Sequence, residues 1–175
     1  ATYSAQAQCQ PLAAGTYTVG GTQADYSSLE AALQAVQCAG VQGPVVLQLQ
    51  AGVYTGAYVL PNLPGALHMV TLRGAAGVRF ERPVNALQSE CVVINGGRWQ
   101  LEQLHFDRPQ RMRNPGPLVK INGGSGHQLR ANRFTDATPD RRAANQALWA
   151  VAADSLQIDS NRFEGFSRAV VVQGP

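Results

Sequence analysis

The chain has 175 residues, of which 14% are Asp, Glu, Lys or Arg, 45% are hydrophobic and 7% are aromatic. Soluble domains carry about 25% charged residues, so this chain is charge-poor, yet it is too apolar to be disordered. Its 18 Gly and 10 Pro exclude a coiled coil, and no apolar run is long enough to cross a membrane. The length suits one domain, and short segments punctuated by Gly and Pro favour a mostly β fold.

The formal net charge is +3, and 13 of the 14 basic residues are Arg, Lys120 being the single lysine. A charge of this size does not indicate nucleic-acid binding. No two His residues share the spacing of metal ligands, so we expect neither a metal site nor a cofactor. The run of small residues that starts at Ala1 is similar to sequences beside a signal-peptidase site, which favours a secreted or cell-surface protein.

The first third of the chain contains an extended arm, a short strand and a helix. Residues 1–14 are expected to form the arm, and the strand lies around Tyr17. The sequence from Ser27 to Glu30 matches a capping box and predicts a helix near residues 27–38. Gly40 suits the end of that helix. Its apolar face consists of Leu29, Ala32, Leu33 and Val36.

From Val45 onward, apolar and polar residues alternate with a period of two, which predicts half-buried strands. Beyond these strands, the segments 94–106, 121–134 and 151–163 align with one another as an internal repeat. The aligned residues Phe106 and Phe134 are 28 positions apart, and the next equivalent Phe follows after 29. No crossover helix separates the repeats, so their strands are expected to stack in parallel as a solenoid with rungs about 4.8 Å apart.

The alignment predicts columns of equivalent side chains along this solenoid. Two inward columns are Leu101, Leu129 and Ile158, and Phe106, Phe134 and Phe163. Two outward columns are an amide ladder of Gln100, Gln128 and Gln157, and a row of alternating charges, Glu102, Arg130 and Asp159. Asn132 and Asn161 occupy equivalent turns, where stacked amides can bond each other and the backbone.

The Leu-x-x-Asn-x-Phe pattern at residues 129–134, with its counterpart at 158–163, resembles the rung repeat of the right-handed parallel β-helix (pectin-lyase-like) superfamily. The segments 15–21, 43–47 and 52–55 are similar to the start of secreted Bacteroidota-type β-helix proteins, in which a helix caps the solenoid.

This resemblance implies an all-β fold, a right-handed parallel β-helix of about five rungs with an N-terminal capping α-helix. A single β-helix domain would span residues 15–175, with its clearest repeats at 91–175. The superfamily includes lyases, hydrolases, esterases, adhesins and surface-layer proteins, so the resemblance does not select an activity.

Three cysteines leave at least one thiol unpaired if a disulfide forms. Cys9 precedes the first strand and Cys38 ends the cap helix, so a bond between them would pin the arm to the cap. Such a bond suits an exported protein. We expect Cys91 to be a small buried hydrophobic residue.

Two long loops that follow Phe106 and Phe134 are expected to leave the solenoid at the same corner. The arginines of this corner are Arg108, Arg111, Arg113, Arg141 and Arg142. Their guanidinium groups suit a carboxylated or sulfated glycan, for example a cell-surface or matrix polysaccharide, and they also suit lipid phosphates. A pair of solvated loops with internal Asp–Arg pairing explains the same residues.

The best candidate for a carboxylate cluster follows the same repeat. Asp107, Asp136 and Glu164 each come shortly after the Phe of a rung, although charges that solvate the turn edges are the favoured interpretation. His105 is expected to point outward, in one column with Arg133 and the arginine of the following repeat, in a surface role.

The last segment of the chain predicts an open strand edge. Ala169, Val170, Val171, Val172 and Gln173 form an apolar, strand-forming run that nothing in this sequence covers. Such an edge invites a further strand. Either the protein continues into more rungs, or the edge docks onto a neighbour, with the arm 1–14 as one contact. Head-to-tail contacts that do not close would produce filaments.

Two functional hypotheses result. The first is a secreted, non-catalytic β-helix that acts as a structural or adhesive protein and self-assembles end to end into extracellular filaments. The second is a carbohydrate-active lyase or hydrolase, or a fragment of one, that acts on acidic polysaccharide at the arginine-rich corner. The absence of a compact catalytic set from the sequence and the open edge favour the first hypothesis.

Overall fold

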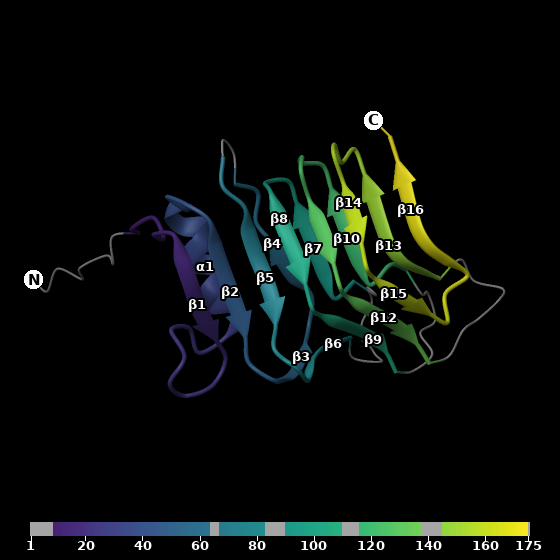
Figure 1. Cartoon of the computed structure of the whole chain (residues 1–175), viewed down its shortest axis with the longest axis horizontal. Coiled ribbons are helices and arrows are strands. Elements are labelled where there is room, and N and C mark those ends of the chain that lie inside the picture. The colour runs from purple at the N-terminus through teal and green to yellow at the C-terminus, as the bar shows by residue number, and fades with distance from the viewer. Residues whose placement is uncertain (1–8, 64–66, 83–89, 110–115, 138–144, 175) are drawn as a thin grey trace, which may run out of the picture.

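The computed structural model describes residues 9–63, 67–82, 90–109, 116–137 and 145–174. These residues form three parallel β-sheets that wind around one apolar core as a β-helix, with an α-helix at the N-terminal end (Figure 1). The paired strands of all three sheets are parallel, as a solenoid without crossover helices requires. The predicted all-β parallel β-helix is therefore confirmed.

Each sheet collects one strand from every turn of the chain. Sheet 1 comprises β1 (Gly15–Val19), β2 (Val45–Leu49), β5 (Val70–Gly74), β8 (Trp99–Glu102), β11 (Gln128–Arg130) and β14 (Gln157–Asp159). Sheet 2 comprises β3 (Gly52–Thr55), β6 (Val78–Glu81), β9 (His105–Arg108), β12 (Arg133–Asp136) and β15 (Arg162–Glu164). Sheet 3 comprises β4 (Tyr58–Leu60), β7 (Val92–Asn95), β10 (Val119–Asn122), β13 (Gln146–Val151) and β16 (Arg168–Gln173).

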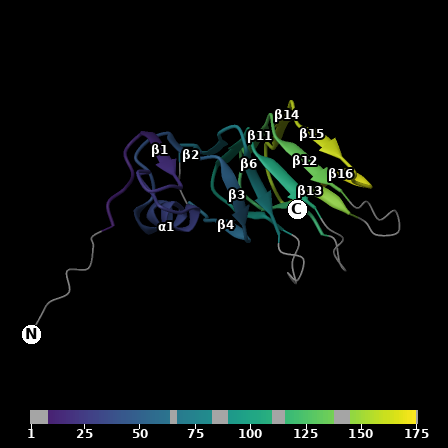
Figure 2. The same ribbon diagram turned by 90° about the horizontal axis from the view of Figure 1, so that it is seen from below.

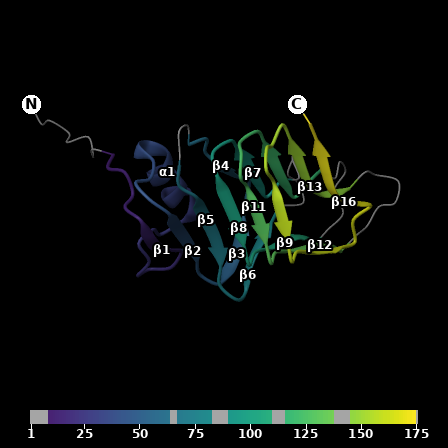
Figure 3. The same ribbon diagram turned by 45° about the horizontal axis from the view of Figure 1, so that its top comes forward.

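Within the described chain, the strands after β1 form five successive triplets, one strand from each sheet. The last triplet, β14, β15 and β16, is called the C-terminal rung below. Figure 3 shows β5, β8 and β11 of sheet 1 side by side, although more than twenty residues separate each from the next. The pairing register places Leu101 beside Leu129 and Leu129 beside Ile158, which confirms the first predicted inward column.

The phenylalanine column is longer than the repeat indicated. The rings of Phe106 and Phe134 stack with centroids 5.0 Å apart, and those of Phe134 and Phe163 with centroids 4.9 Å apart. Phe80 extends the column at 5.3 Å from Phe106, and Tyr54 stacks on Phe80 at the same distance. Sequence alignment missed Phe80 because it precedes Phe106 by 26 residues, a spacing outside the 28 to 29 of the later repeats.

The asparagine ladder forms as expected at the turns between sheets 1 and 2. The Nδ2 group of Asn132 donates to Oδ1 of Asn161 at 3.0 Å and to the carbonyl of Leu101 at 2.8 Å. Its Oδ1 accepts the backbone N–H of Leu104 at 3.0 Å. One side chain thus satisfies buried backbone groups of a neighbouring rung, which stabilises the turn.

The outward columns agree with prediction in register but only partly in bonding. Gln100, Gln128 and Gln157 are in register. Nevertheless, Nε2 of Gln100 donates to Glu102 at 3.3 Å, and no hydrogen bond joins two of these amides among the described residues. The prediction of a hydrogen-bonded amide ladder is therefore wrong. The alternating charges pair in part, since Arg130 lies 3.6 Å from Asp159, whereas Glu102 pairs with Arg73 of the preceding rung at 2.8 Å.

The helix α1 (Leu29–Ala39) closes the N-terminal end of the solenoid (Figure 2). Ser28 caps it by accepting the N–H of Ala31 at 3.2 Å, and Gly40 ends it with a positive φ of 75°. The predicted capping box is corrected, because the cap falls at Ser28, so Glu30 lies one position short of the third helical residue that the motif requires. The described chain contains no helix that could span a membrane.

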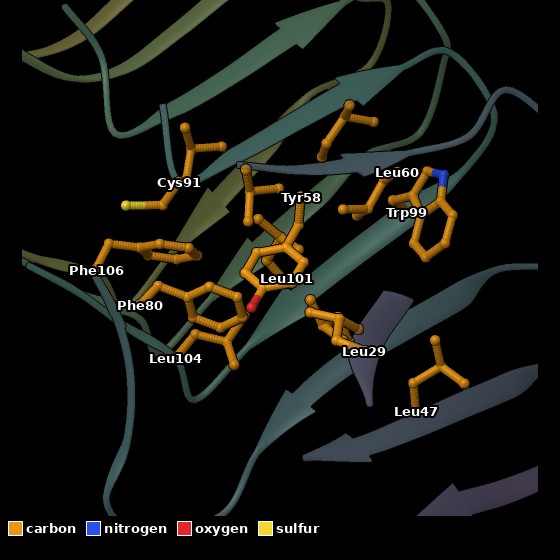
Figure 4. Close-up of a cluster of buried hydrophobic side chains, with 14 of the residues drawn as sticks. Leu29, Leu47, Tyr58, Leu60, Phe80, Cys91, Trp99, Leu101, Leu104 and Phe106 are labelled. Carbon is orange, nitrogen blue, oxygen red and sulfur yellow. The ribbon is translucent and has the colours of Figure 1, made fainter. Parts of the chain in front are cut away.

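Side chains from the three sheets and from α1 form one core. Figure 4 shows Leu29 of α1 in the same cluster as Leu47, Tyr58 and Phe80. Cys91 is also fully buried there, and burial raises the pKa of its thiol to about 12, so it remains a protonated, apolar-like side chain.

Candidate functional site

The outer surface of sheet 2 carries charged and polar side chains in columns, because alternate residues of each strand point away from the core. Two columns of these residues are in register. They are Arg79, His105, Arg133 and Arg162 in one column, and Glu81, Asp107, Thr135 and Glu164 in the other. These eight residues are called the charged face below.

Opposite charges on this face neutralise each other. The guanidinium of Arg79 lies 2.6 Å from Glu81 and 3.7 Å from Asp107, bridging two rungs. Arg133 lies 3.0 Å from the carboxylate of Glu164. Its hydrogen bond lowers the pKa of Glu164 below the usual carboxyl value. Ion pairs at this exposure contribute little stability each, but they leave the face without excess charge.

His105 lies at the centre of the charged face in a chain of hydrogen bonds. Thr135 donates its hydroxyl proton to Asp107 at 2.5 Å, so its oxygen accepts from Nε2 of His105 at 2.8 Å. This arrangement assigns the proton of the neutral ring to Nε2. Burial lowers the pKa of His105, so the ring is neutral at neutral pH. A hollow of about 510 Å³ beside the ring is lined in part by Arg79 and Arg133.

The hydroxyl of Thr135 is not an activated nucleophile in this arrangement, since it donates to a carboxylate and not to the imidazole. The predicted column of His105 with Arg133 and Arg162 is confirmed by the register. The chain of bonds links two rungs, as expected for a surface ladder.

The predicted carboxylate cluster is corrected by the same alternation. Asp107 and Glu164 share an outward column, with Thr135 between them. Asp136, in contrast, follows inward-facing Phe134 by two positions and is therefore also directed inward, with 6% of its surface exposed. The three carboxylates do not converge on one point.

The prediction that Arg108 belongs to a ligand-binding corner at the surface is also wrong. It follows inward-facing Phe106 by two positions, is 2% exposed and lies 2.8 Å from Oδ2 of Asp136. Its guanidinium also stands over the ring of Phe166 at 5.9 Å and donates to the carbonyl of Gly116. Arg108 therefore forms a buried ion pair and is not available to a ligand at the surface.

Asn145 completes this buried site. Its Nδ2 donates to Asp136 at 2.7 Å and to the carbonyl of Gly165 at 3.1 Å, while its Oδ1 accepts the N–H of Ser167 at 2.7 Å. The site ties the C-terminal rung to the preceding one. The remaining arginines of the predicted corner, Arg111, Arg113, Arg141 and Arg142, lie outside the described residues.

Another buried polar group lies beside Trp99. Nδ1 of His127 accepts the backbone N–H of Trp99 at 3.3 Å, and Nε2 donates to the carbonyl of Gly123 at 3.0 Å. Burial lowers the pKa of His127, so the ring is held neutral and bridges two rungs. It therefore acts as a structural residue.

The C-terminal rung exposes apolar side chains beside free sheet edges. It ends all three sheets, so β14, β15 and β16 each carry one unpaired edge. Inward-facing Ile158 and Val172 are 38% and 57% exposed, whereas Leu129 and Ala150, one rung earlier in the same columns, are at most 1% exposed. The predicted run from Ala169 to Gln173 lies within β16.

The N-terminal arm is partly tied down. The structure joins Cys9 to Cys38, the pair that the sequence suggested, with Cα atoms 5.6 Å apart. Leu12 accepts the N–H of Gln42 at 2.8 Å and donates to the carbonyl of Gly40 at 3.0 Å. Residues 9–14 therefore follow the end of α1, and residues 1–8 lie outside the described chain.

Comparison with known proteins adds no family to these observations. No family model, curated protein or solved structure matches the chain.

Proposed function

We propose that this chain is an extracellular, non-catalytic β-helix module that serves as a structural subunit and self-associates through its C-terminal rung. The observation that supports this proposal is the exposure of Ile158 and Val172, whose equivalents in earlier rungs are buried. Each β-rung in the molecule covers the apolar columns of its neighbour. A second copy can supply the missing cover, since unpaired strand edges readily accept further strands.

The C-terminal rung of the second copy is the surface that best matches this end. The N-terminal end is closed by α1, whose outward positions Glu30, Gln34 and Gln37 are polar and exposed. In contrast, two C-terminal rungs bury apolar columns against each other. Their edges carry charges of both signs, so a symmetric contact can bring opposite charges together. These edge residues are Asp159, Arg162, Glu164 and Arg168.

Two further observations support the rest of the proposal. The charged face pairs its carboxylates with arginine or threonine side chains, which suits a structural ladder better than a general acid and base. The Cys9–Cys38 disulfide suits an oxidising compartment such as the cell exterior.

Sedimentation-velocity ultracentrifugation over a wide range of protein concentrations tests the self-association. We expect a reversible dimer of the wild type and a monomer of Val172→Lys, because a charge would then face the second copy's apolar column. Val59→Lys is the matched control, since Val59 is 51% exposed but points outward on β4. A wild-type protein that stays monomeric, or a Val172→Lys variant that still dimerises, would contradict the proposal.

Electron microscopy of the assembled protein tests its symmetry. A contact between two C-terminal rungs uses the same surface twice and stops at a pair, as closed two-fold assemblies do. The head-to-tail filaments expected from the sequence would instead place the C-terminal rung against the polar side of α1. Pairs support the symmetric contact, and filaments that disappear with Val172→Lys would overturn it in favour of head-to-tail assembly.

A further inference from the structure

A small pocket lies at the N-terminal end of the solenoid, where the loop after β1 and the start of α1 approach β3 and β4. Its volume is about 320 Å³, close to the lower limit of ligand-binding clefts. Its walls come from separate parts of the chain, namely residues 20–21, 27–30 and 50–54, together with Tyr58. Neither the proposed self-association nor the charged face uses this pocket.

Two tyrosine rings line the pocket on the side of the core. Tyr54 is the N-terminal end of the aromatic column. Phe80 stacks on one face of its ring, and β3 is the first strand of sheet 2, so no described strand covers the other face. The ring of Tyr58 meets that of Tyr54 at 67°, with centroids 6.5 Å apart, and Figure 4 shows Tyr58 next to Phe80. The face of an aromatic ring carries partial negative charge and attracts cations.

The hydroxyl of Tyr58 is a polar group without a partner. Tyr58 is 7% exposed and lines the pocket, yet its hydroxyl forms no hydrogen bond with any described residue. The hydroxyl of Tyr54, in contrast, donates to the carbonyl of Gln50 at 2.9 Å. Burial and the carboxylate of Glu30 raise the pKa of Tyr58 to about 12, so its hydroxyl keeps its proton. Buried polar groups are normally satisfied, and a polar ligand atom in the pocket would satisfy this one.

Glu30 supplies the charge of the pocket. It is the only charged residue among the described residues of the walls, it is exposed, and it forms no ion pair within the described chain. Because Ser28 caps α1, the carboxylate of Glu30 is not used for a capping box. The pocket therefore carries one negative charge that no cation of the described chain neutralises.

Glycines keep the backbone close to the pocket. Gly20 and Gly21 have positive φ values of 90° and 88°, which disfavour other residues. A Cβ atom at Gly21 would lie 2.5 Å from Oε1 of Gln50, and one at Gly20 would lie 3.0 Å from the hydroxyl oxygen of Tyr54. The space beside the tyrosines is therefore built into the turn after β1.

We propose that this pocket binds a primary alkylammonium group, held by the ring of Tyr54, the hydroxyl of Tyr58 and the carboxylate of Glu30. An ammonium group donates three hydrogen bonds, and a carboxylate and a phenol oxygen both accept them. The ring faces add attraction for the same charge. An anion would instead face Glu30 with no cationic side chain in the described walls to hold it. A quaternary ammonium group has no N–H to donate to the hydroxyl of Tyr58.

NMR titration of the disulfide-bonded protein with cadaverine tests the site. We expect saturable shifts of the amide signals of Gly20, Gly21 and Tyr58. Glu30→Gln should bind roughly tenfold more weakly, because a neutral amide does not pair with a cation. Tyr58→Phe should bind roughly threefold more weakly, because it removes only the hydroxyl. The matched control is Asp154→Asn, which removes an exposed carboxylate from the turn after β13 and should bind like the wild type.

Matched ligands test the chemistry of the group that binds. The uncharged 1,5-pentanediol has the length of cadaverine and should bind far more weakly, and tetramethylammonium should bind more weakly than cadaverine as well. A free amine and a lysine side chain present the same ammonium group. Nα-acetyl-lysine amide distinguishes these two sources, since tighter binding than that of cadaverine identifies a lysine side chain and weaker binding identifies a free amine.

Several results would overturn this proposal. They are no saturable binding of cadaverine or Nα-acetyl-lysine amide at millimolar concentration, equal binding by the wild type and Glu30→Gln, and binding of the diol or of tetramethylammonium as tight as that of cadaverine. The pocket lies at the opposite end of the solenoid from Val172, so Val172→Lys should bind cadaverine normally. Amine binding and self-association can therefore fail independently of each other.

Discussion

The inward-facing apolar side chains of the solenoid are covered at its N-terminal end and exposed at its C-terminal end. At the N-terminal end, Tyr58 and Leu60 of β4 are at most 7% exposed, because α1 packs against that strand. At the C-terminal end, Ile158 and Val172 are 38% and 57% exposed. Within the described chain, the apolar columns are therefore covered at one end and exposed at the other, and the proposed self-association rests on this difference.

The largest expected difference between the middle and the C-terminal end of the stack is in the phenylalanine column. Phe106 is fully buried between two rings, whereas Phe163 stacks on one described ring only. We expect Phe106→Ala to lower the free energy of unfolding by about 3–5 kcal/mol and Phe163→Ala to lower it by clearly less. Urea unfolding of a dilute, monomeric sample measures both. Equal losses of unfolding free energy would indicate that Phe163 is packed as tightly as Phe106 in the monomer.

The N-terminal end can be loosened by removing the disulfide. The double variant Cys9→Ser/Cys38→Ser should lose about 2–4 kcal/mol of unfolding free energy, since the bond closes a loop with a sequence separation of 29 residues. Reductant should destabilise the wild type to the same extent and leave the variant unchanged, because Cys91 is already a thiol. A variant as stable as the wild type would show that α1 caps this end without help from the arm.

The asparagine ladder offers a smaller comparison of the same kind. Asn132 accepts the buried N–H of Leu104, and Asn161 accepts the N–H of Asn132 in the same way, but Asn161 lies in the C-terminal rung and is only partly buried. We expect Asn132→Ala to cost about 1–3 kcal/mol in unfolding free energy, because that N–H loses its acceptor, and Asn161→Ala to cost less. Urea unfolding of the two variants tests this order. The reverse order would mean that the last turn supports the stack more than the inner one.

The smallest expected effects concern two exposed carboxyl groups. The pKa of Asp25 is lowered by hydrogen bonds from the backbone N–H and hydroxyl of Thr18, and that of Glu164 by its hydrogen bond with Arg133. A lowered pKa means that each carboxylate stabilises the fold above its ordinary pKa and that this contribution is lost as the pH falls through the lowered value.

Salt distinguishes these two causes. NMR titration in roughly 1 M NaCl should return the pKa of Glu164 toward its ordinary value, since salt screens exposed ion pairs, and should leave that of Asp25 nearly unchanged. Equal shifts for the two groups would contradict the assignment of their causes. Titration of Arg133→Gln, which should raise the pKa of Glu164 without salt, is the control.

The sequence by itself determined the parallel β-helix, because equivalent residues that recur every 28 or 29 positions can only bury their apolar faces by stacking. It also determined the helix near α1 and the register of the Leu101 and Phe106 columns. The burial of Arg108 and Asp136 could have been inferred as well, since each follows an inward Phe by two positions. Their charge suggested a surface role instead.

The tertiary structure decided what depends on distances between rungs. The ring of His105, the hydroxyl of Thr135 and the carboxylate of Asp107 form a chain only because adjacent rungs bring them together. The exposed C-terminal end is likewise a property of the stacked rungs. The same stacking suits the low content of charged residues. Side chains that repeat every few ångströms along a column pack closely when most of them are uncharged.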